Sequence, residues 1–293
     1  MANSSSKQVL SAKHAFITGG SGGIGGACGK SLLADGANIS LMARNQQALD
    51  NTRDELLSAY PDAGDRIFLY AGDARDKQEL CAALNQSTEH FGSLDIAIAT
   101  VGGGAIKPLL LHDEASFAEE LSFNILSTFL LVRYAAPLMA KTASAESTAS
   151  IVCISSDAAK LVFPWLSAYT TSKSGLEGFV KSAAEELSGL NIRVNAVRPG
   201  LTRTAATQAI FDNPEVKTEF AAQKPLNRLG EPEDISAGVR YLAGPESSWV
   251  TGQSFAIEGG NELRKAPDMQ AMVRQIYGDK AFEQVLKGIA PND

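Results

Sequence analysis

"HAFITGGSGGIGGACGKSLL" (residues 14–33) runs from an apolar segment, through a cluster of glycines, into a stretch of helical period. In a strand–turn–helix unit, such glycines permit a tight turn and let the backbone approach a pyrophosphate at the helix N-terminus, where free N–H groups point outward. Gly20, Gly22 and Gly25 satisfy the general G-x-G-x-x-G pattern. Because a glycine-rich stretch matches that pattern easily, a purely structural turn is the alternative.

A more specific pattern, T-G-x-x-x-G-x-G, is also present in the same stretch. Thr18, Gly19, Gly23 and Gly25 meet it, with the apolar strand before them and the helix after them. This order predicts a dinucleotide-binding turn. The residues expected to contact the cofactor here are Thr18, Gly19, Ser21, Gly22, Gly23, Ile24 and Gly25.

The rest of the chain alternates short apolar runs with longer stretches of helical period, which indicates repeated βα units. Strands are expected at residues 14–18, 37–42, 66–70, 94–100, 150–155, 192–197 and 254–258. Helices are expected at residues 23–34, 45–58, 76–90, 114–141, 167–188 and 232–243. The predicted fold is a single α/β domain with a doubly wound, parallel, seven-stranded sheet, the Rossmann fold.

The chain of 293 residues has the size of one large α/β domain with short additions. Residues 1–12 are expected to form a flexible arm, and residues 13–260 the dinucleotide-binding catalytic domain. Residues 261–293 form a C-terminal extension in which Met269, Met272, Val273 and Ile276 predict an amphipathic helix over Pro267–Tyr277. We expect this extension to pack on its own or a neighbouring subunit.

Composition excludes several classes of partner and site. A balance of 26 Lys+Arg against 33 Asp+Glu gives a formal charge of -7, which predicts no nucleic-acid and no membrane partner. Cys28, Cys81 and Cys153 are widely spaced and lie in no His-rich cluster, so no metal site is expected. Free thiols and the lack of about 18 consecutive apolar residues favour a cytoplasmic protein.

The end of the second predicted strand, "LMARN", bears on the choice of cofactor. Ala43 stands where NAD-binding folds place an acidic residue, and Arg44 follows it, 19 residues after Gly25. A guanidinium can bind the 2′-phosphate of NADP by two charge-assisted hydrogen bonds, whereas a carboxylate would repel it. The sequence therefore favours NADP(H), with NAD(H) as the alternative if Arg44 is only a solvated residue.

"GDARD" follows the third predicted strand, at the edge where parallel sheets bind ligands. Asp73 and its neighbour Ala74 are expected near the adenine of the cofactor. The alternative is that Asp73 only forms the turn.

Tyr169 and Lys173 lie one helical turn apart in "SAYTTSKSGLEGF" (residues 167–179). A free tyrosine has a pKa of about 10, too high for efficient proton transfer near neutrality. A nearby cation favours the phenolate and lowers that pKa, and Lys173 and an oxidised nicotinamide ring can both supply the charge. The pair is a candidate for acid/base chemistry, although any two residues at this spacing share a helical face.

Two polar residues upstream complete the candidate site. Ser156 follows a predicted strand 13 residues before Tyr169 and could hydrogen-bond a substrate oxygen, with Ser155 as the alternative if the register shifts by one. Asn124 interrupts an apolar helical stretch and needs a partner once buried, and backbone capping is its structural alternative.

In this order, "TGGSGGIG", "GDARD", "FN" (123–124), "ISS", "YTTSK", "VRPGLTRT" and "EGG" resemble the short-chain dehydrogenase/reductase family over about Lys13 to Gly260. The resemblance implies a tetrad of Asn124, Ser156, Tyr169 and Lys173. Tyr169 would be the general acid/base, Ser156 would orient the substrate oxygen, and Asn124 would hold a water relay. Lys173 would bind the nicotinamide ribose and lower the tyrosine pKa.

The resemblance also implies contacts around the nicotinamide and a common assembly. The residues concerned are Gly102, Tyr169, Lys173, Pro199, Gly200, Thr202 and Thr204. A homotetramer or homodimer is the usual assembly. The chain departs from the family where "ATVG" (99–102) replaces N-N-A-G, and Thr202 stands where a branched apolar residue is usual.

These features predict reversible hydride transfer between NADP(H) and a carbonyl or secondary alcohol. Phe163, Pro164 and Trp165 predict an apolar pocket, with packing in the core or against another subunit as the alternative. With the segment 204–229 as a lid, such a pocket suits a ketoreductase of a bulky apolar or cyclic substrate. One alternative is an NAD-dependent secondary-alcohol dehydrogenase. Another is a dinucleotide-binding sensor or scaffold without turnover.

Overall fold

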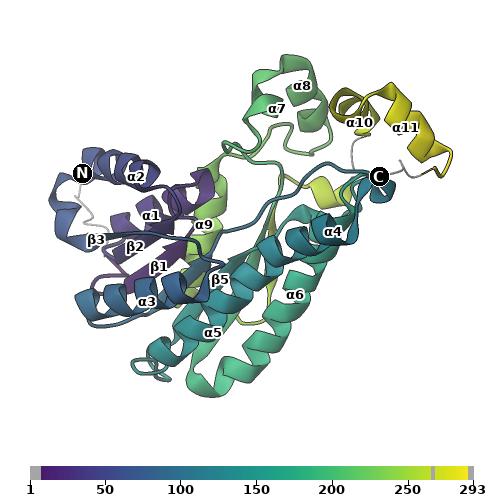
Figure 1. Ribbon diagram of the computed structural model, residues 1–293. Helices are drawn as coiled ribbons and strands as arrows, with labels where there is room; N and C mark the ends of the chain where they lie inside the picture. The colour runs from purple at the N-terminus through teal and green to yellow at the C-terminus, as the bar shows by residue number, and fades with distance from the viewer. Residues whose placement is uncertain (1–7, 265–267, 290–293) are drawn as a thin grey trace.

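A computed structural model describes residues 8–264 and 268–289, and its centre is a parallel sheet with the strand order β3-β2-β1-β4-β5-β6-β7 (Figure 1). The strands are β1 (His14–Thr18), β2 (Asn38–Ala43), β3 (Ile67–Ala71), β4 (Ile96–Ala99), β5 (Ala149–Ile154), β6 (Ile192–Pro199) and β7 (Ser254–Ile257). Each neighbouring pair is parallel. The predicted seven-stranded, doubly wound sheet is confirmed.

The strand order places a crevice at one edge of the sheet. Strands β2 and β3 lie on one side of β1, whereas β4 to β7 lie on the other. The chain therefore leaves β1 and β4 in opposite directions, and ligands of open α/β sheets bind outside the carboxyl ends of the strands at such a point.

Helices cover both faces of the sheet, so β1, β5 and β6 are buried along their whole length. On one face lie α1 (Gly23–Ala34), α2 (Gln46–Ala59) and α9 (Pro232–Ala243), and on the other α3 (Lys77–Phe91), α5 (Ser127–Met139) and α6 (Ser167–Leu187). The Asn45 and Asp76 side chains accept hydrogen bonds from the first turns of α2 and α3, which fixes where these helices begin.

The long helix predicted over residues 114–141 is interrupted. It consists of α4 (Glu114–Leu121), a π-helical turn (Ser122–Leu126) and α5. Such turns often occur at functional sites, and this one contains Asn124. By length and composition alone, Glu114–Met139 would also suffice to span a membrane, although Glu119, Glu120 and Arg133 interrupt its apolar residues. Here Leu131, Ala135 and other side chains of α5 belong to the core of the domain.

A cap of helices extends beyond the carboxyl ends of the strands (Figure 1). Helices α7 (Gln208–Asp212) and α8 (Pro214–Ala222) belong to the predicted lid segment, and α10 (Gln270–Tyr277) and α11 (Asp279–Leu286) to the C-terminal extension. The helix predicted over 267–277 is found as α10, with Pro267 outside the described residues. The sequence-based interpretation missed α7, α8 and α11.

Both ends of the described chain pack on the domain. Leu10 is buried and its backbone N–H donates to Asp35 O, so residues 8–12 of the expected flexible arm are held in place, whereas residues 1–7 lie outside the described range. In the extension, Met269 packs with Phe211, Phe220 and Leu229 of the cap. The described part of the extension therefore packs on its own chain.

Candidate active site

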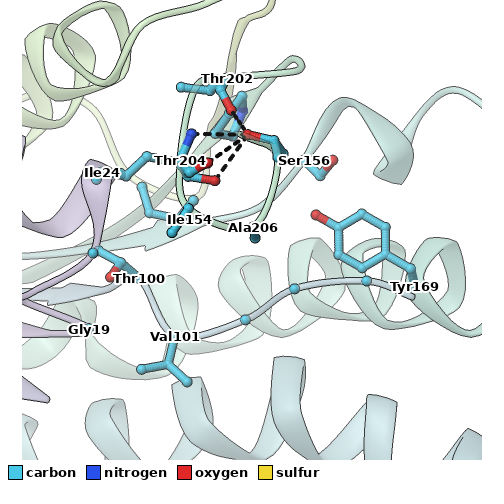
Figure 2. A pocket seen from close by; sticks show the side chains of 18 of the residues that line it. Gly19, Ile24, Thr100, Val101, Ile154, Ser156, Tyr169, Thr202, Thr204 and Ala206 are labelled. Carbon is cyan, nitrogen blue, oxygen red and sulfur yellow. Dashed lines mark hydrogen bonds between the residues drawn. The ribbon is translucent and has the colours of Figure 1, made fainter. Parts of the chain in front are cut away.

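A cavity of about 650 Å³ lies at the carboxyl ends of the strands, between the glycine turn and the cap (Figure 2). Most residues predicted from the sequence line it, whereas Thr18 and Asn124 do not. The lining includes Gly19, Ser21, Gly22, Gly23, Ile24, Gly25, Arg44, Asp73, Ala74, Gly102, Ser156, Tyr169, Lys173, Pro199, Gly200, Thr202 and Thr204. Residues far apart in the sequence are thus brought to one cavity.

The turn between β1 and α1 leaves room for an anion at the start of the helix. Gly19 has a left-handed φ of 71°, and a Cβ at Gly25 would overlap the Gly19 carbonyl oxygen, so glycine is needed at both positions. No side chain caps α1 at Gly22. Uncapped N–H groups and a positive helix end fit the pyrophosphate of a dinucleotide.

Arg44, Asp73 and Arg75 line the far end of the cavity, beside β2 and β3. The Asp73 carboxylate accepts hydrogen bonds from the Arg75 backbone (2.9 Å) and guanidinium (3.4 Å). Burial opposes its charge, but these bonds and the charge of Arg44 lower the pKa of Asp73. Asp73 therefore forms a turn and lines the cavity as well. Arg75, which sequence reasoning missed, also binds Glu119.

Threonines tie β1 to β4 beneath the turn, which explains why Thr18 stays out of the cavity. The Thr18 hydroxyl donates to Ile98 O (3.3 Å), and the Thr100 hydroxyl donates to Thr18 O (2.7 Å). Thr100, in "ATVG", thus joins the two strands although the asparagine that is usual there is absent.

The glycines that follow "ATVG" let a loop pass close to the tyrosine and the lysine. A Cβ at Gly104 would lie 2.5 Å from Tyr169 Cγ, and a Cβ at Gly102 would lie 2.9 Å from Lys173 Nζ. Any side chain at these positions would collide with one of the two predicted site residues. Glycine at positions 102 and 104 is therefore a steric requirement of the site.

Asn124 holds this loop from behind. Its side-chain amide donates to Gly103 O (2.9 Å) and Glu120 O (2.9 Å), while its Oδ1 accepts from Gly103 N (3.0 Å). The side chain is fully buried and bonds only backbone among the described residues. The contacts of Asn124 thus match the alternative that its side chain only bonds backbone. Its expected part in a water relay stays a prediction.

Tyr169 extends from α6 toward Ser156 across the cavity (Figure 2). Lys173 Nζ lies 5.8 Å from the centroid of the tyrosine ring and donates to Ile154 O at 2.9 Å. Burial raises the pKa of Tyr169 to about 12 and lowers that of Lys173 to about 8. In the chain alone, desolvation of the phenolate sets the direction of the Tyr169 shift. The expected lowering of the tyrosine pKa by Lys173, together with a bound nicotinamide, stays a prediction.

Ser156, and not Ser155, presents its hydroxyl beside Tyr169. The Ser155 hydroxyl donates to Glu177 Oε1 at 3.2 Å and is therefore engaged. Ser156 Oγ accepts from Ala158 N (3.1 Å) and donates to Asp157 Oδ1 (3.2 Å). The register predicted from the sequence is correct.

The walls next to Tyr169 include residues that the sequence did not single out. Of the predicted apolar trio, only Phe163 lines the cavity; Pro164 is exposed, and Trp165 packs against Phe282 of α11 at 5.3 Å between ring centroids. Further lining residues are Ile106, Leu166, Ile210, Phe220, Lys224, Asn261, Met269 and Met272. Ile210, Phe220 and Lys224 lie in the predicted lid segment 204–229, and the helical spacing of Met269 and Met272 was a second signal.

The fold and sequence match proteins of known class. A family model described as enoyl-(acyl carrier protein) reductase matches residues 19–262. A short-chain type dehydrogenase/reductase from Mycobacterium ulcerans superimposes with a TM-score of 0.86 at 31% identity, covering 94% of this chain and 98% of that one. The chain belongs to the short-chain dehydrogenase/reductase family.

Two further members of this family act on steroids. The 3alpha-hydroxysteroid dehydrogenase of Mediterraneibacter gnavus is 34% identical over 86% of this chain and 97% of its own length. A 7alpha-hydroxysteroid dehydrogenase, solved with NADH and 7-oxo glycochenodeoxycholic acid, superimposes with a TM-score of 0.80 at 31% identity, covering 89% and 98% of the chains. As a short-chain dehydrogenase/reductase, the chain binds a nicotinamide dinucleotide and acts on CH–OH or C=O groups of small molecules.

Proposed function

We propose that this protein is an NADP(H)-dependent ketoreductase that reduces a bulky apolar or cyclic ketone to a secondary alcohol, reversibly. The observation that carries the proposal is the convergence of Tyr169, Ser156 and Lys173 at the floor of an apolar cavity that continues into the glycine turn. The intact tyrosine and lysine speak against the alternative of a sensor or scaffold without turnover.

Each of these side chains has a distinct part in the reaction. A bound nicotinamide dinucleotide supplies or accepts the hydride. Ser156 holds the substrate oxygen, and Tyr169 donates its proton to that oxygen during reduction or removes it during oxidation. Lys173 binds the nicotinamide ribose and stabilises the phenolate that Tyr169 leaves behind. Asn124 fixes the glycine loop that packs over the Tyr169 ring. It also holds the water relay that returns a proton to Tyr169.

Arg44 supports NADP(H) as the cofactor. Its exposed guanidinium lines the far end of the cavity and has no hydrogen-bond partner among residues 8–264 and 268–289. It can therefore bind a 2′-phosphate. Use of NAD(H) is the alternative, supported by the similar 7alpha-hydroxysteroid dehydrogenase structure that holds NADH.

The substrate half of the cavity supports a large ring system. Phe163, Leu166, Phe220, Met269 and Met272 give it apolar walls, which suit a steroid-like ketone. The steroid dehydrogenases among the relatives point the same way. We also propose that the protein is cytoplasmic and forms a homotetramer or homodimer, the usual assemblies of this family.

The decisive experiment is a panel of cyclic and steroid ketones, with the matching alcohols, tested with each of the four nicotinamide cofactors. We expect NADPH absorbance to fall with at least one bulky ketone, at a kcat/KM that exceeds that with NADH. Turnover with NAD⁺ and alcohols alone would support the dehydrogenase alternative. A protein that binds NADPH but turns over no member of the panel would contradict the proposal.

A further inference from the structure

A buried cation lies in the substrate half of the cavity, and the proposed reaction does not use it. Lys224 follows α8 in the lid segment and lines the cavity, although the residue is only 3% exposed. Its stem runs along Gly259, where an added Cβ would lie 3.5 Å from both Cβ and Cδ of Lys224. The side chain is therefore held between the end of α8 and the segment that follows β7.

The ammonium group of Lys224 has no partner of its own in the part of the chain that the structure describes. Within residues 8–264 and 268–289 it forms neither a hydrogen bond nor an ion pair. Two acidic residues face it from other elements, Asp157 in the turn after β5 and Glu258 after β7. Whether Lys224 is free to bind a ligand depends on what these two groups do.

Both acidic groups are engaged elsewhere. The two Glu258 oxygens accept backbone N–H groups at 2.9 and 3.1 Å, and this residue lines a neighbouring cavity. The Asp157 carboxyl accepts the side-chain amide of Asn261 at 2.8 Å, and burial raises the pKa of Asp157, which favours its neutral form. Toward the substrate, Lys224 therefore presents a positive charge that no neighbour neutralises.

A bulky substrate would make this charge costly. While the cavity holds solvent, water hydrates the ammonium. A ketone that fills the space between the apolar walls displaces that water, and a buried cation without a partner is strongly unfavourable. A substrate that brings its own anionic group removes this cost, whereas a purely apolar substrate does not.

The chemistry of the donors favours a carboxylate. Gln223, which precedes Lys224, also lines the cavity, and its side-chain amide makes no hydrogen bond within the described ranges. A carboxylate has two acceptor oxygens and forms charge-assisted hydrogen bonds with an ammonium. Lys224 and Gln223 can therefore share one carboxylate at this end of the cavity.

We propose that Lys224 determines specificity by binding a carboxylate of the substrate, which is therefore a keto acid: a bulky, largely apolar ketone with one carboxylate. Gln223 supplies a second hydrogen bond to that group. The apolar walls hold the carbon skeleton, and Lys224 fixes its direction in the cavity. The inference rests on the proposed function, since it names the class of ketone that the same cavity takes.

Matched ketones test the charge without any change to the protein. The wild type is assayed with NADPH and a set of cyclohexanone carboxylic acids and oxo-cholanic acids, each beside its methyl ester, which keeps the skeleton but lacks the charge. We expect kcat/KM for the best acid to exceed that for its ester by about 30-fold. Equal values within every pair of acid and ester would overturn the proposal.

Lys224→Met removes the ammonium and keeps an unbranched apolar stem. In this variant the ratio of kcat/KM for the acid to that for its ester should fall to about threefold or less. Lys217→Met makes the same change on the exposed side of α8 and should keep the ratio of the wild type. A purely structural Lys224 would lower the melting temperature and both values of kcat/KM, and an unchanged ratio would overturn the proposal.

A binding measurement separates this inference from the proposed reaction. Cyclohexane carboxylate and cholanate, which lack the ketone, are titrated calorimetrically into the NADP⁺-bound protein. We expect their dissociation constants to rise at least about 10-fold in Lys224→Met and to stay unchanged in Lys217→Met. Equal or absent binding in the wild type and Lys224→Met would overturn the role of Lys224 even if ketones are reduced. A wild type that reduces no ketone but binds these acids through Lys224 would instead overturn the proposed reaction.

Discussion

The turn between β1 and α1 presents backbone to the cavity, whereas the cap presents side chains. At Gly19 and Gly25 the absence of a Cβ is what counts, since added atoms would overlap neighbouring atoms. In the cap, Phe220, Met269 and Met272 form a wall of flexible or bulky side chains. The cofactor half therefore tolerates little change, and the substrate half can change its shape by substitution.

Tyr169 lies where the two halves meet, and its loss should have the largest effect. Tyr169→Phe removes the proton donor but keeps the ring, so kcat/KM for ketone reduction should fall about 1000-fold while the NADPH dissociation constant stays within about threefold. Steady-state kinetics and fluorescence titration measure the two quantities. Tyr60→Phe, outside the cavity, is the matched control. Activity within a few fold of the wild type would refute the assignment.

Gly25→Ala tests the backbone half. The added methyl would overlap the Gly19 carbonyl oxygen, so we expect the free energy of unfolding to fall by about 3 kcal/mol and the NADPH dissociation constant to rise at least about 10-fold. Gly26→Ala on the same helix has its nearest neighbour at 3.5 Å and should fold and bind as the wild type does. Denaturant unfolding and cofactor titration would show whether the two variants differ.

Arg44→Ala tests the side-chain part of the cofactor half. Loss of a two-pronged contact to the 2′-phosphate should raise the KM for NADPH about 30-fold, or about 2 kcal/mol, and leave that for NADH unchanged. Arg53→Ala removes the same charge from the exposed face of α2 and serves as the control. Equal effects on NADPH and NADH would show that Arg44 does not read the phosphate.

Met272→Ala should give the smallest effect and sharpen the contrast between the halves. The lost apolar contact should raise the KM for a bulky ketone about fivefold, or about 1 kcal/mol, with a smaller change for a small ketone and none for NADPH. Ile276→Ala, also on α10 but 55% exposed and outside the cavity lining, is the control. A change in cofactor affinity would mean that the cap also supports the cofactor half.

The cofactor half of the cavity could be predicted from the sequence, whereas most of the substrate half could not. The glycine turn, Ser156, Tyr169 and Lys173 follow from local spacing, because each motif acts within one strand–helix unit. The cap could not be predicted, because α7, α8 and α11 are short and depend on tertiary contacts. Helices α7 and α8 pack on one another and on residues near the rim of the sheet, and α11 packs on α10 and on Trp165. For Trp165 the packing alternative holds, and local sequence could not decide between the two because its partner, Phe282, is more than a hundred residues away.

Electrostatic properties were also beyond local sequence reasoning. The spacing of Tyr169 and Lys173 predicted a lowered tyrosine pKa, but in the chain alone the depth of burial decides the direction, and burial depends on the glycine loop packed over the ring. Such arrangements arise from the tertiary fold.

The most direct test of the proposed reaction is to follow the hydride itself. NADPH carrying deuterium at the transferable position of nicotinamide C4 is incubated with the protein and the best ketone of the panel, and the product is analysed by mass spectrometry and NMR. We predict one deuterium on the carbinol carbon of the alcohol and a slower single-turnover rate than with unlabelled NADPH. Alcohol without deuterium at that carbon, or no alcohol with any ketone, would contradict hydride transfer at this site.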